Sequence, residues 1–233
     1  MPKLLKESAI FVADAHYPHH GSEFLQLLKE LKSNHIQTPQ LILMGDIFDL
    51  LFGHNEYIKS FSTKAIELLQ ELSQTIDIIY LEGNHDFCLK ELFPNIIVYR
   101  REQQPVHFTL NSKDVYLSHG DKYETNFGYN FYSKLIRNSI VLKLLQPFEK
   151  TIINNQIERL QQKKICKSFK NYQNRFNAIL NHYPKDSIVI EGHFHQGLIH
   201  KNYISLPSLA CQKEIAIVRD GEIVFEKICS LIV

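Results

Sequence analysis

Residues 40–49 read Gln-Leu-Ile-Leu-Met-Gly-Asp-Ile-Phe-Asp, and the rest of the chain is organised around this stretch. The apolar run over residues 41–44 predicts a short strand that is buried on both faces. The run stops at Gly45, and the carboxylates of Asp46 and Asp49 follow it. A buried carboxylate is costly unless a cation, a histidine or hydrogen-bond donors lie beside it. Because open α/β sheets bind ligands at the carboxyl ends of their strands, the sequence predicts a polar site here.

The overall composition is that of an ordinary globular protein. The 233 residues are 44% hydrophobic and 22% charged, which suits one large domain or a domain with an insertion. The amino terminus carries charge where a signal peptide needs an apolar segment, and no apolar run approaches the ~18 residues of a spanning helix. We therefore expect a cytoplasmic protein. The four cysteines lack a C-x-x-C pair, so we expect buried free thiols rather than disulfides or zinc ligands at Cys88, Cys166, Cys211 and Cys229.

The charges are distributed unevenly. Residues 121–185 hold 12 Lys and Arg against 4 Asp and Glu, whereas the remainder holds 14 against 21. Such a basic block suits an anionic partner such as phosphate, nucleic acid or an acidic lipid surface, and it equally suits a solvated helical face. Helical periodicity recurs in this block. We therefore predict a single domain over residues 1–233 that contains a basic helical insertion, a lid, over residues 121–185, with helices over 129–145, 148–164 and 169–182.

Five predicted strands are each followed directly by polar side chains. These strands span residues 8–13, 40–44, 76–81, 115–118 and 187–191. Helices predicted over 21–32 and 56–74 connect the first three strands, which indicates a parallel sheet built from right-handed βαβ units. Shorter strands are predicted over 96–99, 106–110, 204–206, 214–218 and 223–227.

The polar residues after these strands form a mixed set of carboxylate, amide and imidazole side chains. Each alone is ambiguous, because an aspartate often caps a helix and a lone histidine is often structural. In the D-x-H and H-x-H pairs, however, residues two apart point the same way along an extended chain. Seven candidate ligands with one bridging carboxylate suit two cations ~3.5–4 Å apart, an arrangement that hydrolyses phosphate esters. A lone tetrahedral zinc would need only about four ligands. The seven candidates are Asp14, His16, Asp46, Asn84, His119, His193 and His195.

The ordered motifs resemble those of a known family. D-x-H at Asp14, G-D-x-x-D at Gly45, G-N-H-D at Gly83, H-G at His119 and G-H-x-H at Gly192 resemble, in this order, the calcineurin-like metallophosphoesterases. The resemblance covers residues 8–195. It implies an α/β (α+β) fold, a four-layer metallophosphoesterase β-sandwich flanked by helices, with a dinuclear site at one end.

The resemblance also implies a division of ligands. Asp14, His16, Asp46 and His195 would hold the first ion, and Asp46, Asn84, His119 and His193 would hold the second. Asp46 would bridge the two ions, which would lower the pKa of a bridging water and supply hydroxide to attack phosphorus. Oxygen ligands mixed with imidazoles favour two Mn²⁺ ions, with Fe or Zn as alternatives.

By the same resemblance, His85 is a catalytic residue and not a ligand. The carboxylate of Asp49 would orient its ring and keep it protonated, so that His85 stabilises or protonates the leaving oxygen. The alternative is that His85 only braces its turn. His19 and His20 follow the D-x-H motif closely enough to line the mouth of the site.

Within the family, the chain length, the insertion and the short carboxyl-terminal hairpin are most similar to the UDP-2,3-diacylglucosamine pyrophosphatases of lipid A synthesis. Those enzymes cleave a nucleotide-sugar lipid to UMP and lipid X, which implies a phosphorylated lipid substrate and peripheral contact with the anionic inner membrane. The implied substrate contacts are Asn84, His85, Lys163, Lys164 and Lys167. Residues 131–148 would line an acyl groove or, equally, pack on the scaffold.

One departure keeps other functions open. Those enzymes carry arginine where this chain has His85, so a general phosphodiesterase or phosphomonoesterase of the same superfamily remains an alternative. A non-catalytic scaffold is a third hypothesis, which the complete ligand set disfavours. Nucleic acid is disfavoured as a partner, because aromatic and basic residues do not interleave outside the insertion.

Overall fold

The computed structural model describes residues 3–53, 55–122, 149–162, 164–167 and 172–231. Its strands are β1 (Lys3–Leu4), β2 (Ile10–Val12), β3 (Gln40–Leu43), β4 (Leu51–Phe52), β5 (Asp77–Leu81), β6 (Asp86–Phe87), β7 (Ile97–Tyr99), β8 (Val106–Leu110), β9 (Lys113–Ser118), β10 (Ile188–Glu191), β11 (Leu198–His200), β12 (Tyr203–Ser205), β13 (Glu214–Arg219) and β14 (Glu222–Lys227). Its helices are α1 (Glu23–Lys32), α2 (Glu56–Ser60), α3 (Thr63–Leu72), α6 (Glu149–Gln162), α7 (Tyr172–Leu180) and α8 (Leu209–Gln212).

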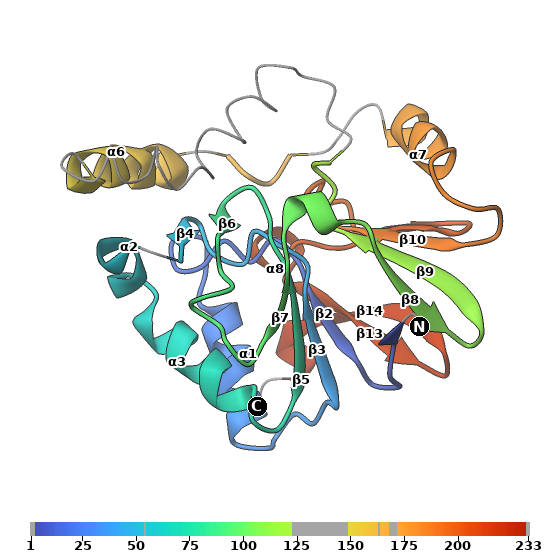
Figure 1. Ribbon diagram of the computed structural model, residues 1–233, viewed down its shortest axis with the longest axis horizontal. Coiled ribbons are helices and arrows are strands. Elements are labelled where there is room, and N and C mark those ends of the chain that lie inside the picture. Colours follow the sequence, from blue (N-terminus) through green and yellow to red (C-terminus); the bar gives the residue numbers. More distant parts are fainter. Residues whose placement is uncertain (1–2, 54, 123–148, 163, 168–171, 232–233) are drawn as a thin grey trace.

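Two six-stranded sheets make the centre of the fold (Figure 1). One sheet has the order β14-β13-β2-β3-β5-β7, and the other has the order β1-β8-β9-β10-β12-β11. In the first sheet, β2, β3, β5 and β7 run parallel. In the second, β10 runs parallel to both β9 and β12. The carboxyl ends of these parallel strands therefore gather at one edge of the two sheets.

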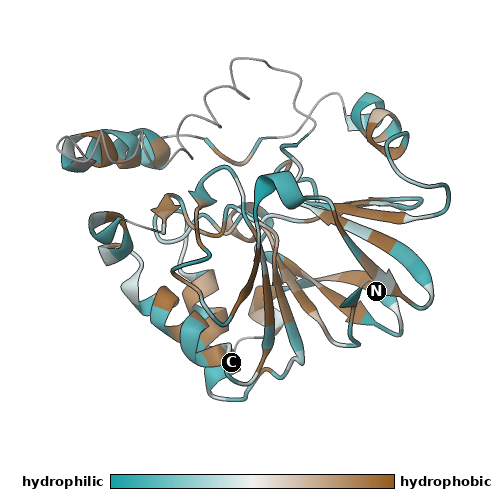
Figure 2. Ribbon diagram, in the orientation of Figure 1, coloured by the Kyte–Doolittle hydropathy of each residue, from teal (hydrophilic) through white to brown (hydrophobic). Residues whose placement is uncertain are grey.

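The alternation of side chains along β2 and β3 divides the core into two clusters. Ile10 and Leu41 face outward and pack in a cluster with Phe24 and Leu28 of α1. Their neighbours Phe11 and Ile42 face inward and join a cluster with side chains of β8, β9 and β10 in the other sheet. Both clusters are buried because successive side chains of a strand point to opposite faces. Figure 2 shows the apolar residues concentrated along these strands.

A third cluster covers the outer face of the second sheet. Phe176 and Ile179 of α7 pack with Val189 and Tyr203 of that sheet. The layers are thus helices α1 and α3, the two sheets, and α7. The predicted mixed α/β sandwich flanked by helices is confirmed.

The helices differ from the sequence prediction in two described places, one of which is the short helix α8, which was not predicted. The single helix predicted over residues 56–74 is divided into α2 and α3, and Ser62 is the N-cap of α3. Serine is a weaker helix former than alanine or leucine, which favours a break here, although the Ser62 side chain makes no capping hydrogen bond. The helix predicted over 129–145 lies outside the described residues. None of the helices in the described ranges has the length and hydrophobicity that crossing a membrane requires.

Candidate metal centre

The predicted site residues do meet at the edge where the parallel strands end. Asp14 and His16 follow β2, Asp46 follows β3, and Asn84 and His85 follow β5. From the second sheet, His119 follows β9, and His193 and His195 follow β10. The two sheets therefore contribute donor side chains to the same region.

The first group of donor side chains consists of Asp14, His16 and His195. One donor atom from each lies within 4.8 Å of the others. The Nε2 atom of His195 is 3.2 Å from Oδ1 of Asp14. His16 Nδ1 is buried and makes no hydrogen bond within the described part of the protein, and the buried Asp14 Oδ1 has only the His195 ring nitrogen beside it. Because unsatisfied buried polar atoms are costly, these atoms suit a bound cation.

The second group consists of Asp46, His119 and His193, whose donor atoms also lie within 4.8 Å of one another. His119 Nε2 is 3.6 Å from Asp46 Oδ1 and 3.2 Å from Asn84 Oδ1. The other ring nitrogen of His119 lies 2.9 Å from the Met44 carbonyl oxygen. A carbonyl only accepts, so His119 donates from Nδ1 and directs Nε2 toward Asp46 and Asn84. Carboxylate, imidazole and amide donors in these positions fit a divalent cation.

Burial and the neighbouring charges together set the protonation of the histidines in the site. Burial lowers the pKa of His16 and of His193 to about 4, so both rings are neutral near pH 7 and can ligate. For His119, burial also disfavours the charged form, but the carboxylates of Asp46 and Asp121 outweigh it and raise the pKa to about 9. Burial likewise opposes the charged form of Asp46, yet neighbouring imidazoles, first that of His119, hold its pKa well below the usual range.

The turn that carries Asp46 is held by a residue to which we assigned no role from the sequence. The carboxylate of Asp86 accepts hydrogen bonds from the backbone N–H groups of Asp46 (3.0 Å), Ile47 (2.6 Å) and Gly83 (2.9 Å). It also accepts one from the Tyr80 hydroxyl at 2.7 Å. Asp86 is the last residue of the G-N-H-D motif, and that position in the motif was the available signal.

Two glycines are required by close approach to the site. A Cβ atom on Gly45 would lie 2.5 Å from Nδ1 of His119, and Gly45 also has a φ of 86°. A Cβ atom on Gly83 would lie 2.4 Å from the backbone nitrogen of Asp46. Only glycine lets these turns approach the candidate ligands so closely.

Most of the candidate ligands adopt an uncommon backbone conformation. The φ angles are positive at Asp14 (50°), His16 (46°), Asp46 (52°), His193 (62°) and His195 (54°). This left-handed region is unfavourable for residues with a Cβ atom, and such residues cluster at functional sites. All five lie within four residues of the end of a strand.

The predicted pairing of His85 with the Asp49 carboxylate is wrong in its geometry. Nδ1 of His85 lies 2.8 Å from the backbone carbonyl oxygen of Asp49. The Asp49 carboxylate instead accepts from His19, through the backbone N–H at 2.9 Å and the ring Nδ1 at 2.8 Å. The turn after β3 therefore directs the Asp49 side chain toward His19 and its carbonyl toward His85. Nε2 of His85 lies 4.0 Å from Asp46 Oδ2, on the side of the candidate ligands.

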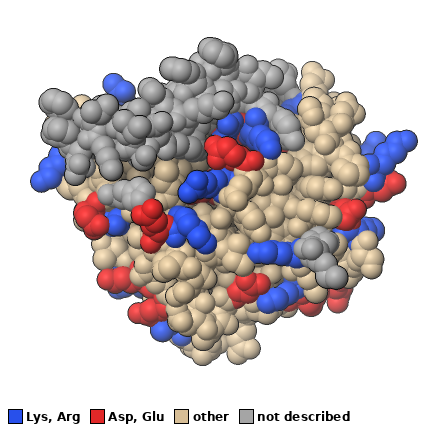
Figure 3. Space-filling view, in the orientation of Figure 1, with Lys and Arg blue, Asp and Glu red and all other residues tan. Residues whose placement is uncertain are grey.

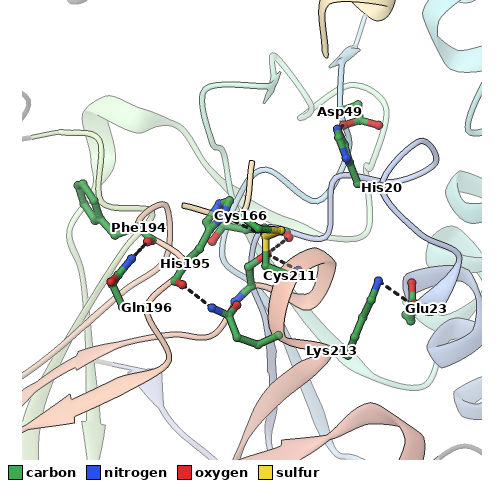
Figure 4. Close-up of a disulfide and its surroundings, with 12 residues drawn as sticks. His20, Glu23, Asp49, Cys166, Phe194, His195, Gln196, Cys211 and Lys213 are labelled. Carbon is green, nitrogen blue, oxygen red and sulfur yellow. Dashed lines mark hydrogen bonds and ion pairs between the residues drawn. A yellow bond between two sulfur atoms is a disulfide. The ribbon is translucent and has the colours of Figure 1, made fainter. Parts of the chain in front are cut away.

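The prediction of four buried free cysteines is also wrong. Cys166 and Cys211 form a disulfide, with their Cα atoms 5.4 Å apart, and of the two free cysteines Cys229 is exposed. A separation of 45 residues leaves no local sequence signal for this pair. Figure 4 shows the disulfide beside His195, and Cys211 Sγ is 3.6 Å from Nδ1 of that histidine. The bond thus ties the insertion to α8 next to a candidate ligand.

Two of the three lysines predicted as substrate contacts lie in the described part of the insertion. Lys164 and Lys167 are exposed and flank Cys166. Lys163 and the apolar stretch 131–148 lie outside the described residues. Within the described part, α6 packs onto the scaffold through Ile153 and Ile157. Its Leu160 carbonyl oxygen lies 3.1 Å from Nε2 of His20, which reaches it from the loop after the D-x-H motif.

Comparison with known proteins agrees with this geometry. A family model described as calcineurin-like phosphoesterase matches residues 8–197. The UDP-2,3-diacylglucosamine hydrolase of Histophilus somni (strain 129Pt) is 26% identical over 209 residues, covering 84% of this chain and 87% of that protein. The protein of the same name from Photorhabdus laumondii is 26% identical over 215 residues, covering 82% and 83%. Among solved structures, Yfce, a phosphoesterase from E. coli, is similar in fold with a TM-score of 0.50, 11% identity, and coverage of 96% and 94%.

Proposed function

Since the chain belongs to the calcineurin-like phosphoesterase family and is a phosphoester or diphosphate hydrolase, we propose that it cleaves the pyrophosphate of UDP-2,3-diacylglucosamine. The products would be UMP and lipid X. The reaction would use two divalent metal ions, Mn²⁺ in the first instance.

The observation that carries this proposal is the pair of donor groups at one edge of the sheets. Asp14, His16 and His195 form one group, and Asp46, His119 and His193 form the other. Asn84 adds an amide oxygen beside His119. Asp46 belongs to the second group, and its carboxylate also acts on the pKa of His16 in the first group, which supports a bridging role.

The chemistry follows from this donor set. Two bound dications would lower the pKa of a water held between them, supplying hydroxide at neutral pH, and would offset the charge of the phosphate. The carboxylates of Asp14 and Asp46 cancel only half the charge of two dications, so the loaded site stays positive and attracts an anionic substrate. Asp86 fixes the turn that presents Asp46.

His85 has a defined orientation in this scheme. Because its Nδ1 must donate to the Asp49 carbonyl oxygen, Nε2 is the atom left to face a bound phosphoester. In the imidazolium form, Nε2–H would donate to the leaving oxygen. We therefore retain His85 as the residue that assists departure of the leaving group.

The choice of substrate rests on the relatives and on the insertion. The two curated relatives described above are both named for UDP-2,3-diacylglucosamine. In this chain, the exposed Lys164 and Lys167 are tied next to His195 by the disulfide, where they can meet an anionic headgroup. Because the proposed substrate is a lipid, the proposal includes peripheral contact of the protein with an anionic membrane.

A second candidate is a phosphodiesterase or phosphomonoesterase of broader specificity. His85 favours it, because a poor leaving group benefits from a proton donor, whereas a pyrophosphate leaves as a stabilised phosphate and needs little protonation. The two candidates differ in substrate and share the metal centre.

The test is a substrate panel at saturating Mn²⁺. We expect UDP-2,3-diacylglucosamine to be cleaved faster than UDP-N-acetylglucosamine, an aryl phosphodiester and an aryl monoester, because each buried acyl methylene contributes ~0.8 kcal/mol that only the lipid can gain. Asp46→Asn should reduce turnover of all four by more than ~100-fold, since a metal centre contributes several kcal/mol.

Asp114→Asn is the matched control, because Asp114 is exposed and pairs with His107 away from the site. It should leave every rate unchanged. Equal cleavage of the acylated and non-acylated UDP-sugars would favour the broader phosphoesterase. Normal turnover by Asp46→Asn would contradict the proposed metal centre.

A further inference from the structure

Helix α7 of the insertion carries a largely buried arginine that packs next to the second donor group, Asp46, His119 and His193. Arg175 has a side chain only 11% exposed. Its NH2 group donates to the Gly120 carbonyl oxygen at 2.7 Å and to Glu191 Oε2 at 3.3 Å. Its guanidinium carbon lies 3.8 Å from the centre of the Phe194 ring. Arg175 therefore contacts residues adjacent to both His119 and His193.

Glu191 contacts residues next to the same two candidate ligands, His119 and His193. Its side chain is fully buried, and burial raises its pKa although Arg175 and two hydroxyl donors act in the opposite direction. The Tyr203 hydroxyl donates to Glu191 at 2.6 Å, and the Ser118 hydroxyl lies 3.4 Å away. Ser118 immediately precedes His119, and Glu191 precedes His193 by two positions. One buried cluster thus joins the ends of β9 and β10 just before each delivers a donor.

Stabilisation of the fold alone does not account for this buried ion pair. Replacing a buried ion pair by apolar residues of similar volume is often neutral or stabilising, because desolvation offsets the attraction. Arg175 Nε is moreover buried without a hydrogen-bond partner among the described residues, which adds a further cost. What the guanidinium offers instead is a planar fork that fixes the direction of its contacts.

We propose that Arg175 is a positioning residue that holds the His119 and His193 loops at the spacing which the second metal ion requires, and so links the insertion to the metal centre. The inference rests on the proposed dinuclear function. The link is made through the Gly120 carbonyl, the Glu191 carboxylate and the Phe194 ring. Partners of metal ligands act in this way by fixing ligand orientation, and their loss weakens metal affinity by about 10–100-fold.

The test is Mn²⁺ titration of purified, chelator-treated protein, with free Mn²⁺ followed spectroscopically. Arg175→Met should weaken the second Mn²⁺ by about 10–100-fold and leave the first unchanged. This variant also leaves Glu191 buried and unpaired, so its melting temperature should fall. The double variant Arg175→Met/Glu191→Gln removes that charge, and it should regain melting temperature without regaining the second Mn²⁺ affinity.

Arg219→Met is the matched control, since Arg219 is exposed and pairs with Glu226 on the β13–β14 hairpin. It should bind two Mn²⁺ ions as the unaltered protein does. Normal affinity for the second ion in Arg175→Met, or its full recovery in the double variant, would overturn the positioning role. If the unaltered protein itself binds fewer than two ions, the proposed function fails instead.

Discussion

His85 presents Nε2 to the candidate metal centre because a backbone carbonyl, and not a carboxylate, holds its other ring nitrogen. A carbonyl accepts a hydrogen bond without adding a negative charge. The orientation of His85 therefore does not depend on the Asp49 carboxylate, which is already occupied by His19. This arrangement leaves the role of His85 open to a direct test by substrate chemistry.

At the residue scale, we predict that the effect of His85→Ala depends on the leaving group. Turnover should fall ~10²–10⁴-fold on an ester with a poor leaving group, because a positioned proton donor contributes that much. The loss should be far smaller on a pyrophosphate or an activated aryl ester. Rates on the three substrate types are the measurement.

His107→Ala is the control for this series, because His107 is partly exposed and pairs with Asp114. It should change none of the three rates. An equal loss on all three substrates in His85→Ala would indicate that His85 only braces its turn.

At the scale of elements, the described part of the insertion meets the scaffold through both of its helices and through a disulfide. Helix α7 covers the outer face of one sheet, α6 packs beside α2, where the Tyr57 hydroxyl donates to Asn154 at 2.8 Å, and Cys166 is bonded to α8. The described part of the insertion therefore packs on the scaffold, whereas the two explanations offered for residues 131–148 stay predictions, because that stretch lies outside the described residues. On the face shown in Figure 3, described basic and acidic side chains are interspersed.

We predict that Lys164→Ala/Lys167→Ala weakens binding of the acylated UDP-sugar, as measured by its KM. The lysines flank Cys166, whose disulfide partner Cys211 lies 3.6 Å from a ring nitrogen of His195, and on this proposal each would attract a phosphate group of the substrate. The loss should be greater at low salt than at high salt, because salt screens exposed charges. KM for a small aryl phosphodiester should stay nearly constant.

The control for the lysines is Lys185→Ala/Lys201→Ala, which also removes two exposed positive charges, but away from the residues that flank Cys166. Both KM values should then remain as in the unaltered protein. A KM for the lipid that Lys164→Ala/Lys167→Ala does not change would remove these lysines from the substrate site.

At the scale of the whole molecule, local patterns predicted most of the scaffold and the grouping of the site. Apolar runs at 8–13 and 40–44 became β2 and β3, and the polar residues after them meet because parallel strands end at one edge. The failures concern contacts between distant segments. The Cys166–Cys211 bond and the Arg175–Glu191 pair depend on how the insertion folds back, and short-range periodicity does not encode that.

The left-handed backbone at five candidate ligands has a consequence for folding of the whole chain. This conformation costs roughly 1–2 kcal/mol per residue, less for aspartate, so together the five cost on the order of 5 kcal/mol. A domain of ordinary stability has only about 5–15 kcal/mol in total. In metal-free protein we predict that His195→Gly is more stable than His195→Ala by about 1 kcal/mol, because glycine adopts this backbone without strain. Chemical denaturation measures the difference.

His119 has no positive φ and provides the comparison, so there alanine should be the more stable substitution. If alanine were the more stable substitution at His195 as well, the backbone at that ligand would not be strained. In evolutionary terms, selection for stability alone would drive these five positions toward glycine, whereas selection for catalysis would oppose it. A library of variants enriched only for thermal stability should therefore lose the D-x-H and H-x-H motifs early, while one also enriched for hydrolysis should keep them.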